Sequence, residues 1–252
     1  MILEIPSTEN GITRTKTKNQ QLRTENPMSL VTQNISTNEG DLVLGRMQKH
    51  DHEEVLFCYD RPTGLRAMIA IHDTTLGPAL GGTRMWAYAT ESDAFSDVLR
   101  LSRGMTYKSS LAGLDLGGGK AVIIGDSRKD KTEGMFRRFG QFVDSLNGRY
   151  ITAEDVGMST TEMVNIRKQT KHVAGLPEEM GGSGDPSPVT SYGVFCGMRA
   201  AAHTAYGTDA LKGRKVAVQG AGNVGHGLVA LLVKDGATVY ITDIHDDKLA
   251  AF

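Results

Sequence analysis

Two lysines in a nearly uncharged stretch are the residues of this chain best suited to catalysis. The stretch KSSLAGLDLGGGKAVII runs from Lys108 to Ile124 and places Lys120 directly after three glycines. An ammonium group among apolar residues is destabilised by desolvation, so its pKa falls towards the range in which a lysine can accept a proton. The sequence therefore predicts that Lys120 is a general base. The alternative is a core strand whose lysine reaches out to water.

The neighbours of Lys120 predict how it is held. Gly117, Gly118 and Gly119 would leave room for a ligand to approach the backbone, and the run AVII after Lys120 is typical of a short buried strand. A phosphate-binding loop is excluded, because Ala121 stands where that motif needs Ser or Thr followed by a helix.

A second constellation predicts a dinucleotide site. The strand KVAVQG leads into a glycine-rich loop that opens a helix, and the strand TVYITD follows. In this fingerprint the glycines permit a tight turn, close approach of the pyrophosphate and close packing of helix on strand. The helix N-terminus supplies the anion site. The loop consists of Gly220, Ala221, Gly222, Asn223, Val224 and Gly225.

Asp243, at the end of the second strand, indicates which dinucleotide is preferred. Its carboxylate can accept hydrogen bonds from an adenosine ribose 2′-hydroxyl and would repel a 2′-phosphate. The sequence therefore favours NAD over NADP, with His245 as a weak argument to the contrary. The alternative is a structural βαβ unit that binds no cofactor.

The surrounding segments predict a mixed α/β fold. Residues 62–64, Pro-Thr-Gly, separate two apolar runs, which is typical of a hairpin joining two strands. Residues 76–86, with Gly-Pro and Gly-Gly pairs, are predicted to form a loop, and residues 91–103 an amphipathic helix. Residues 150–153 predict a strand, and Asp155 lies at its C-terminal end, where α/β sheets present their site residues.

The composition is that of a globular protein without a nucleic-acid partner. The 252 residues are 39% hydrophobic, enough for a buried core, and the formal net charge of −1 provides no basic surface for nucleic acid. No apolar run reaches the roughly 20 residues of a membrane span. Only two cysteines occur, Cys58 and Cys196, so we expect a protein of the reducing cytoplasm. The cysteines and the scattered histidines lack metal-ligand spacing, so we expect no metal site.

These patterns divide the chain into three segments. Residues 1–40 are rich in Asn, Thr, Gln and Ser, which predicts a flexible extension. Residues 41–186 form one domain, and residues 187–252 form a connecting helix and the first βαβ unit of a Rossmann domain. Because a doubly wound domain has about six strands, we expect an incomplete, truncated Rossmann domain. Its exposed apolar residues would be Val229, Leu231, Leu232 and Val239.

Several motifs occur in order between Glu53 and Leu249: GPALGGTRMW, RLSRGMTYK, GGGKAVIIGD, ITAEDVG, GGSGDPSPVTSYGV and VAVQGAGNVG. Together they resemble the glutamate/leucine/phenylalanine/valine dehydrogenase family, most closely its leucine-specific members. The resemblance implies NAD-dependent reversible oxidative deamination of an L-amino acid to a 2-oxo acid and ammonia. It also implies an N-terminal substrate-binding and dimerisation domain, a C-terminal Rossmann domain and a homo-oligomer.

The resemblance implies roles for individual residues. Lys108 matches the lysine that binds the substrate carboxylate, Lys120 the catalytic lysine, and Asp155 the acid that relays protons to and from the amino group. A fixed cation near Lys120 would lower its pKa further, so that neutral Lys120 could activate the water that attacks the imine. Gly81 and Gly82 match the loop that lines the substrate site.

Further matches concern the cofactor and specificity. Thr190 matches a threonine near the nicotinamide amide, with a helix first-turn residue as the alternative. Leu80 stands where glutamate-specific members carry lysine, and it would leave a substrate side-chain carboxylate unpaired at a cost of several kcal/mol. Ala153 stands where phenylalanine-specific members carry glycine, and its methyl narrows the pocket. One methylene discriminates only about 10 to 200-fold, so leucine, valine and isoleucine are all expected substrates.

Two alternatives to a leucine-specific enzyme stay open. A catalytically inactive, truncated fragment could keep the substrate domain without holding NAD, and NAD binding would distinguish it. A valine or phenylalanine dehydrogenase would be distinguished by relative rates on a panel of amino acids.

Overall fold

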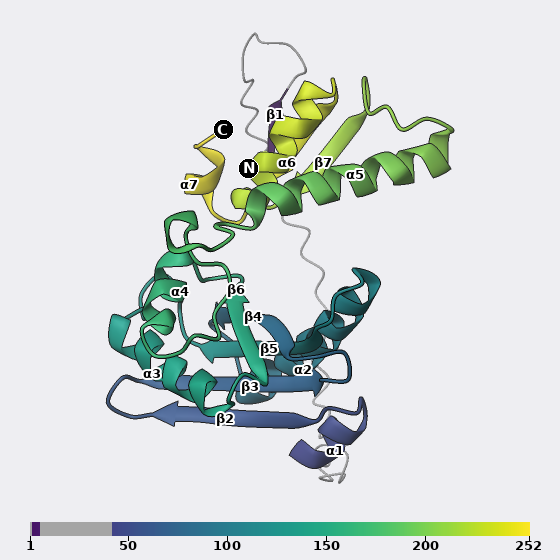
Figure 1. The fold of residues 1–252 in the computed structure, drawn as a ribbon. Coiled ribbons are helices and arrows are strands. Elements are labelled where there is room, and N and C mark those ends of the chain that lie inside the picture. Colours follow the sequence, from purple (N-terminus) through teal and green to yellow (C-terminus); the bar gives the residue numbers. More distant parts are fainter. Residues whose placement is uncertain (1, 6–41) are drawn as a thin grey trace, which may run out of the picture. The chain divides into compact units, whose positions relative to one another are not determined.

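The computed structural model describes Ile2–Ile5 and residues 42–252, which form two compact units. Residues 42–185 belong to one unit, and Ile2–Ile5 with residues 186–252 belong to the other. Each unit combines helices with its own sheet, so the predicted α/β class is confirmed (Figure 1). Within the part of the chain that the structure describes, none of the helices has the length and apolar content of a membrane span.

A five-stranded mixed sheet forms the centre of the first unit. Its strands are β2 (Glu54–Asp60), β3 (Leu65–Asp73), β4 (Ala79–Trp86), β5 (Gly117–Ile124) and β6 (Tyr150–Glu154). They lie in the order β2-β3-β5-β4-β6. The predicted hairpin joins β2 to β3, β3 pairs antiparallel with β5, and β4 pairs in parallel with both β5 and β6.

The prediction of a loop over residues 76–86 is wrong, because most of that segment is the strand β4. Gly81 and Gly82 suggested a turn, yet both are buried inside the sheet. A Cβ on Gly81 would lie 1.6 Å from the carbonyl oxygen of Gly119. Glycine therefore serves here to let two backbones approach closely, which is one of the positional meanings of glycine within strands.

Helices cover both faces of this sheet. The helices of this unit are α1 (Val43–Gln48), α2 (Glu91–Leu111), α3 (Glu133–Ser145), α4 (Thr160–Arg167) and a 3-10 helix (Glu178–Met180). α2 packs on one face, and α3 and α4 lie on the other (Figure 1). Side chains alternate accordingly: Ile69 and Ile123 join the apolar cluster with α3, and Met68 and Val122 join the cluster with α2.

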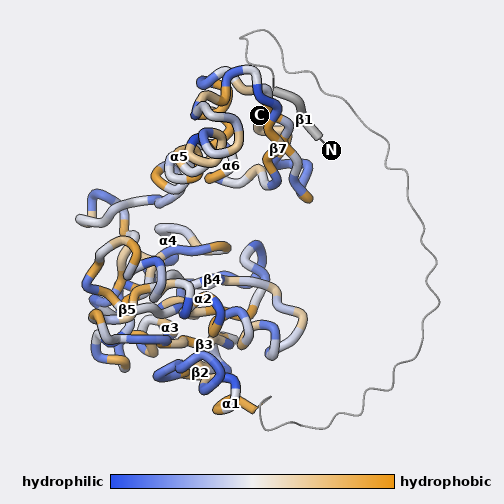
Figure 2. Tube along the Cα trace, turned by 90° about the vertical axis from the view of Figure 1, so that its right-hand side faces the viewer, coloured by the Kyte–Doolittle hydropathy of each residue, from blue (hydrophilic) through white to orange (hydrophobic). Residues whose placement is uncertain are grey.

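The second unit contains the predicted βαβ arrangement. Its elements are α5 (Ser187–Tyr206), β7 (Lys215–Gln219), α6 (Asn223–Lys234), β8 (Thr238–Thr242) and α7 (Asp246–Leu249). β7 and β8 pair in parallel, and α6 is mostly hydrophobic (Figure 2). The prediction of exposed apolar residues is wrong: Val229, Leu232 and Val239 are buried, and Leu231 packs against the same cluster. α5 covers this cluster and contributes Phe195 to it.

A strand from the N-terminal region completes the second sheet. β1 (Ile2–Ile5) pairs antiparallel with β8, which gives the order β1-β8-β7. The prediction of a flexible extension is therefore wrong for Ile2–Ile5, where isoleucine, a β-branched residue that favours strands, occurs twice. The rest of that predicted extension, residues 6–40, lies outside the described residues.

Candidate active site

Most of the predicted substrate and catalytic residues come from three adjacent parallel strands and share one face of the sheet. Gly82 lies opposite Ala153 in the pairing of β4 with β6, and Arg84 lies opposite Val122 in the pairing of β4 with β5. Because Val122 packs against α2 and side chains alternate along each strand, every second residue faces α2. The residues on this face include Leu80 and Gly82 of β4, Lys120 of β5, Ala153 of β6, and Asp155 directly after β6.

Lys120 is buried and paired with Asp155. Only 5% of Lys120 is exposed, and its Nζ lies 3.1 Å from Oδ2 of Asp155. β5 holds the lysine between two neighbouring strands, with Ala70 opposite it on β3. The alternative of a lysine that reaches out to water is therefore wrong for Lys120. The structure brings the two predicted catalytic residues, Lys120 and Asp155, together.

Burial and nearby charges set the protonation of this pair. Burial lowers the pKa of Lys120; Asp155 opposes this effect, while Arg84 and Lys108 add to it, and the pKa ends below its ordinary value. Burial alone would raise the pKa of Asp155, but Lys120 and Arg84 outweigh burial and lower that pKa. The arrangement favours an ionised carboxylate beside a lysine that releases its proton more readily than an exposed one.

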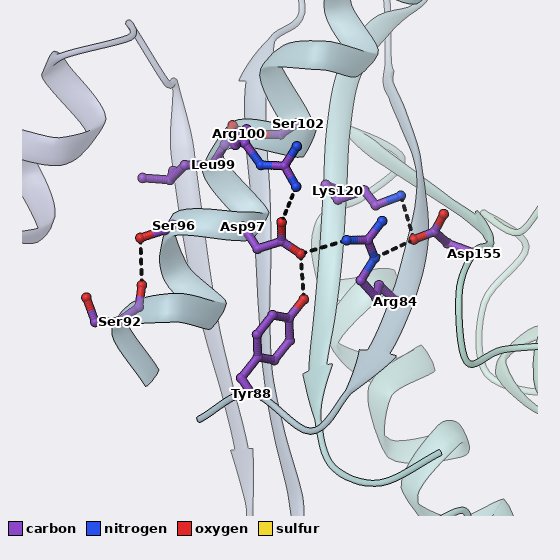
Figure 3. A network of polar contacts seen from close by, with 10 residues as sticks. All are labelled: Arg84, Tyr88, Ser92, Ser96, Asp97, Leu99, Arg100, Ser102, Lys120 and Asp155. Atoms are coloured by element: carbon purple, nitrogen blue, oxygen red, sulfur yellow. Dashed lines mark hydrogen bonds and ion pairs between the residues drawn. The ribbon is translucent and has the colours of Figure 1, made fainter. Parts of the chain in front are cut away.

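A polar network that the sequence analysis missed extends from Asp155 to α2 (Figure 3). Arg84 donates from Nε to Oδ2 of Asp155 at 2.9 Å and from Nη1 to Oδ2 of Asp97 at 2.8 Å. The hydroxyl of Tyr88 donates to the same oxygen of Asp97 at 2.7 Å. Arg100 donates to Oδ1 of Asp97 at 2.5 Å.

The signal that could have revealed Arg84 is the period of two along β4. Leu80, Gly82 and Arg84 fall on one strand face, but this pattern is visible only when the segment is recognised as a strand.

An open pocket of about 500 Å³ lies beside Arg84 rather than beside Lys120. It is lined by Arg84, Trp86, Tyr88, Asp93, Asp97 and Val156.

Lys108 and Gly81, two further predicted substrate-binding residues, have different surroundings. α2 continues past the predicted residues 91–103, so Lys108 stands on its last turn with an exposed side chain. Its charge contributes to the lowered pKa of Lys120. The carbonyl of Gly81 accepts a hydrogen bond from the hydroxyl of buried Tyr150 at 2.6 Å. The Gly81 carbonyl is therefore hydrogen-bonded to the protein core.

The three glycines before Lys120 do not open space for a ligand, and that prediction is wrong. A Cβ on Gly118 would lie 2.1 Å from the backbone nitrogen of Thr106 in α2. A Cβ on Gly119 would lie 2.7 Å from the ring of Tyr150. Protein atoms occupy this space, and the missing side chains let α2 pack directly on β5.

The predicted dinucleotide loop connects β7 to α6. Gly220 has a φ of +109°, a conformation that favours glycine, and a Cβ on Gly225 would lie 2.1 Å from the carbonyl oxygen of Gly220. A Cβ on Gly222 would meet no atom within 4 Å, so the loop is open where the pyrophosphate is expected. α6 begins at Asn223, and its first backbone N–H groups have no partner within the helix. These features fit a dinucleotide.

Asp243 lies at the C-terminal end of β8, beside this loop. Its Oδ2 accepts a hydrogen bond from the N–H of Ala221 and its Oδ1 accepts one from the N–H of His245, each at 2.8 Å. These two bonds lower the pKa of Asp243, so the carboxylate is ionised. A pocket of about 180 Å³ adjoins it, lined by Gln219, Gly220, Thr242, Asp243 and Ile244.

Thr190 lies in the first turn of α5, and Val224 lies where α5 contacts α6. The hydroxyl of Thr190 donates to the carbonyl of Pro186 at 2.9 Å, which is the bond expected of a residue in the first turn of a helix. A contact of Thr190 with the cofactor stays a prediction. The hydroxyl of Ser191 donates to the carbonyl of Val224 at 2.9 Å and so ties the loop to α5. The part of the chain that the structure describes contains no cluster of three or more residues that could hold a metal.

Comparison with known proteins identifies the family. The profile of the Glu/Leu/Phe/Val dehydrogenase dimerisation domain matches residues 52–172, and that of the glutamate/leucine/phenylalanine/valine dehydrogenases matches residues 181–246. Leucine dehydrogenase of Geobacillus stearothermophilus is 59% identical over 204 residues, which cover 81% of this chain and 56% of that protein. Phenylalanine dehydrogenase of Caldalkalibacillus thermarum is 55% identical over 203 residues, which cover 81% of this chain and 55% of that protein.

A solved structure supports the same relationship. The crystal structure of L-tryptophan dehydrogenase from Nostoc punctiforme matches with a TM-score of 0.59 at 43% identity, covering 83% of this chain and 59% of that chain. The chain spans about half the length of the curated relatives it matches. Both matched profiles describe one family and together cover most of the sequence. This chain therefore belongs to the glutamate/leucine/phenylalanine/valine dehydrogenase family of amino acid dehydrogenases.

Proposed function

We propose that this chain carries out the NAD-dependent oxidative deamination of L-leucine and other branched-chain L-amino acids. The observation that carries the proposal is the buried Lys120 paired with Asp155, on a sheet face that also holds Leu80 and Ala153. The reversible reaction converts the amino acid, NAD and water into a 2-oxo acid, ammonium, NADH and a proton.

The side chains of the first unit divide the proton chemistry between them. Lys108 binds the substrate carboxylate. Asp155, held ionised, takes up and returns protons at the substrate nitrogen. Neutral Lys120 accepts a proton from the water that attacks the carbon of the oxidised substrate, and its lowered pKa makes the neutral form available. NAD, when bound, supplies the acceptor for the hydride of the α-carbon.

Two side chains support a branched aliphatic substrate. Leu80 is apolar and half-buried on the α2 face, so no cation from that position would meet a glutamate side chain. Ala153 adds a methyl opposite Gly82 on the same face. The similarity to a leucine dehydrogenase supports leucine, and the similarity to a phenylalanine dehydrogenase keeps an aromatic substrate as the second candidate.

The cofactor, the assembly and the location complete the proposal. The open loop at Gly222 supports a bound pyrophosphate, and the carboxylate of Asp243 supports NAD rather than NADP. The match to a dimerisation domain supports a homo-oligomer. Cys58 and Cys196 are both free thiols, which supports a cytoplasmic location.

The test is NADH formation from L-leucine by the 252-residue chain, with NADP and L-glutamate in parallel assays. We expect turnover with leucine and NAD, little with glutamate, and none in the Lys120→Ala variant. Calorimetric titration with NAD addresses the alternative of an inactive fragment. A chain that neither binds NAD nor turns over leucine would refute the proposed activity.

A further inference from the structure

Arg84 connects the catalytic pair to a second, fixed carboxylate. Oδ2 of Asp155 receives both Nε of Arg84 and Nζ of Lys120 (Figure 3), and the Asp155 side chain is still 24% exposed. We propose that Arg84 is a positioning residue: its guanidinium, anchored by Asp97, keeps Asp155 ionised with Oδ2 towards Lys120 and leaves Oδ1 for the substrate nitrogen. This inference deepens the proposed function and rests on it for the role of Lys120 as the base.

The geometry of the guanidinium supports this role. Two different nitrogens of Arg84 donate to two different carboxylates, at 2.9 Å to Asp155 and 2.8 Å to Asp97. Because the guanidinium is planar and rigid, fixing its Asp97 end also fixes the plane in which it meets Asp155. Asp97 is in turn held by Tyr88 and Arg100, and its side chain is only 14% exposed. A lysine at position 84 could not hold both carboxylates in this way.

The charge of Arg84 matters most when Lys120 is neutral. A general base must lose its proton, and Asp155 then loses one of its two cations. Arg84 remains charged at every relevant pH, so it keeps the half-buried carboxylate ionised at that moment. The charged groups that face Lys120 are Asp155 after β6, Arg84 on β4 and Lys108 on α2, while β3 presents Ala70.

The first test measures the titration of Lys120 without turnover. Lysine 13Cε resonances are followed against pH by NMR, and the Lys120→Met variant assigns the signal. Arg84→Gln should raise the midpoint of Lys120 by about one pH unit, because it removes a neighbouring positive charge. The matched control is Arg138→Gln, which removes an arginine whose Nε donates to Asp60 at 3.0 Å. A midpoint unchanged in Arg84→Gln, or shifted equally in Arg138→Gln, overturns the proposal.

A second measurement leaves Arg84 in place and stands even if Arg84→Gln does not fold. In Lys120→Met the only cation bonded to Asp155 is Arg84, among the contacts of residues 42–252. The 13Cγ resonance of Asp155 should then still titrate below the ordinary value of about 3.9. A midpoint above that value overturns the proposal. Neither titration depends on turnover, so failure of the deamination assay and failure of this inference are distinguishable.

Discussion

An alanine at position 82 would place a methyl group where the neighbouring backbone already lies. A Cβ on Gly82 would stand 2.5 Å from the carbonyl oxygen of Glu154 and 2.9 Å from the Cβ of Asp155. Both distances are below 3.0 Å, a limit that real Cβ contacts essentially never cross. The end of β6 must therefore move away from β4, and Asp155 must move with it.

The size of the effect follows from the atoms that must yield. The nearest obstacle is backbone rather than a flexible side chain, so the strain belongs with overpacked cores, which lose about 1 to 3 kcal/mol. The same movement lengthens the contacts of Asp155 with Lys120 and Arg84, now 3.1 and 2.9 Å. Misplacing a reacting group by about 1 Å costs on the order of 100-fold in rate. We therefore expect Gly82→Ala to lose both stability and turnover.

Urea unfolding and steady-state rates measure the two effects, and Gly104→Ala is the matched control. Gly104 lies within α2, and a Cβ there would meet no atom within 4 Å. Alanine in place of a helical glycine should stabilise the protein by about 0.5 to 1 kcal/mol and leave the rate unchanged. A Gly82→Ala variant with wild-type stability and rate would refute the close-approach argument.

Three further predictions concern the cofactor, the substrate and pH. Asp243→Asn removes the charge that repels a 2′-phosphate, so the ratio of kcat/KM for NAD to that for NADP should fall; an unchanged ratio would contradict the role of Asp243. Leu80→Lys offers a cation to a side-chain carboxylate, so oxidation of L-glutamate should appear while that of L-leucine declines on the same amino acid panel. The folded-state pKa of Lys120 lies below its unfolded value of about 10.4, so the unfolded chain binds more protons between the two values. The free energy of unfolding should therefore gain from Lys120 as pH rises towards 10. Lys120→Met should flatten that rise in urea titrations, and an equal slope in the variant would refute the assignment.

Local patterns predicted the elements whose signals are short-range. The hairpin of β2 and β3 follows from a Pro-Thr-Gly turn between apolar runs, and the βαβ unit follows from a strand, a glycine loop and a helix in sequence. The partnership of Lys120 and Asp155 came from the resemblance to the family, and the structure places the two side chains 3.1 Å apart.

Contacts between distant segments could not be predicted in this way. Glycines occur both in turns and where two strands approach closely. In β4 the second case holds, and this is visible only from the backbone of Gly119, which lies beside Gly81 in the folded structure. The error over β4 also concealed Arg84, whose link to Asp97 joins a strand to a helix. The burial of Leu232 likewise depends on α5, a helix that precedes α6 along the chain and packs on it.

The pleat of the central sheet separates stability from chemistry in the amino acid sequence itself. Residues such as Ile69, Ile123 and Met85 belong to the cluster beneath α3, whereas Leu80 and Ala153 lie on the opposite face with the proposed catalytic pair, Lys120 and Asp155. Substrate preference can therefore drift over generations by substitutions at alternate positions while the apolar side keeps its packing. Apart from Gly82, where a side chain also costs stability, a deep mutational scan should show an alternation with a period of two residues along β4. Substitutions at positions that face α3 should change protein abundance, and substitutions at positions that face α2 should change substrate choice.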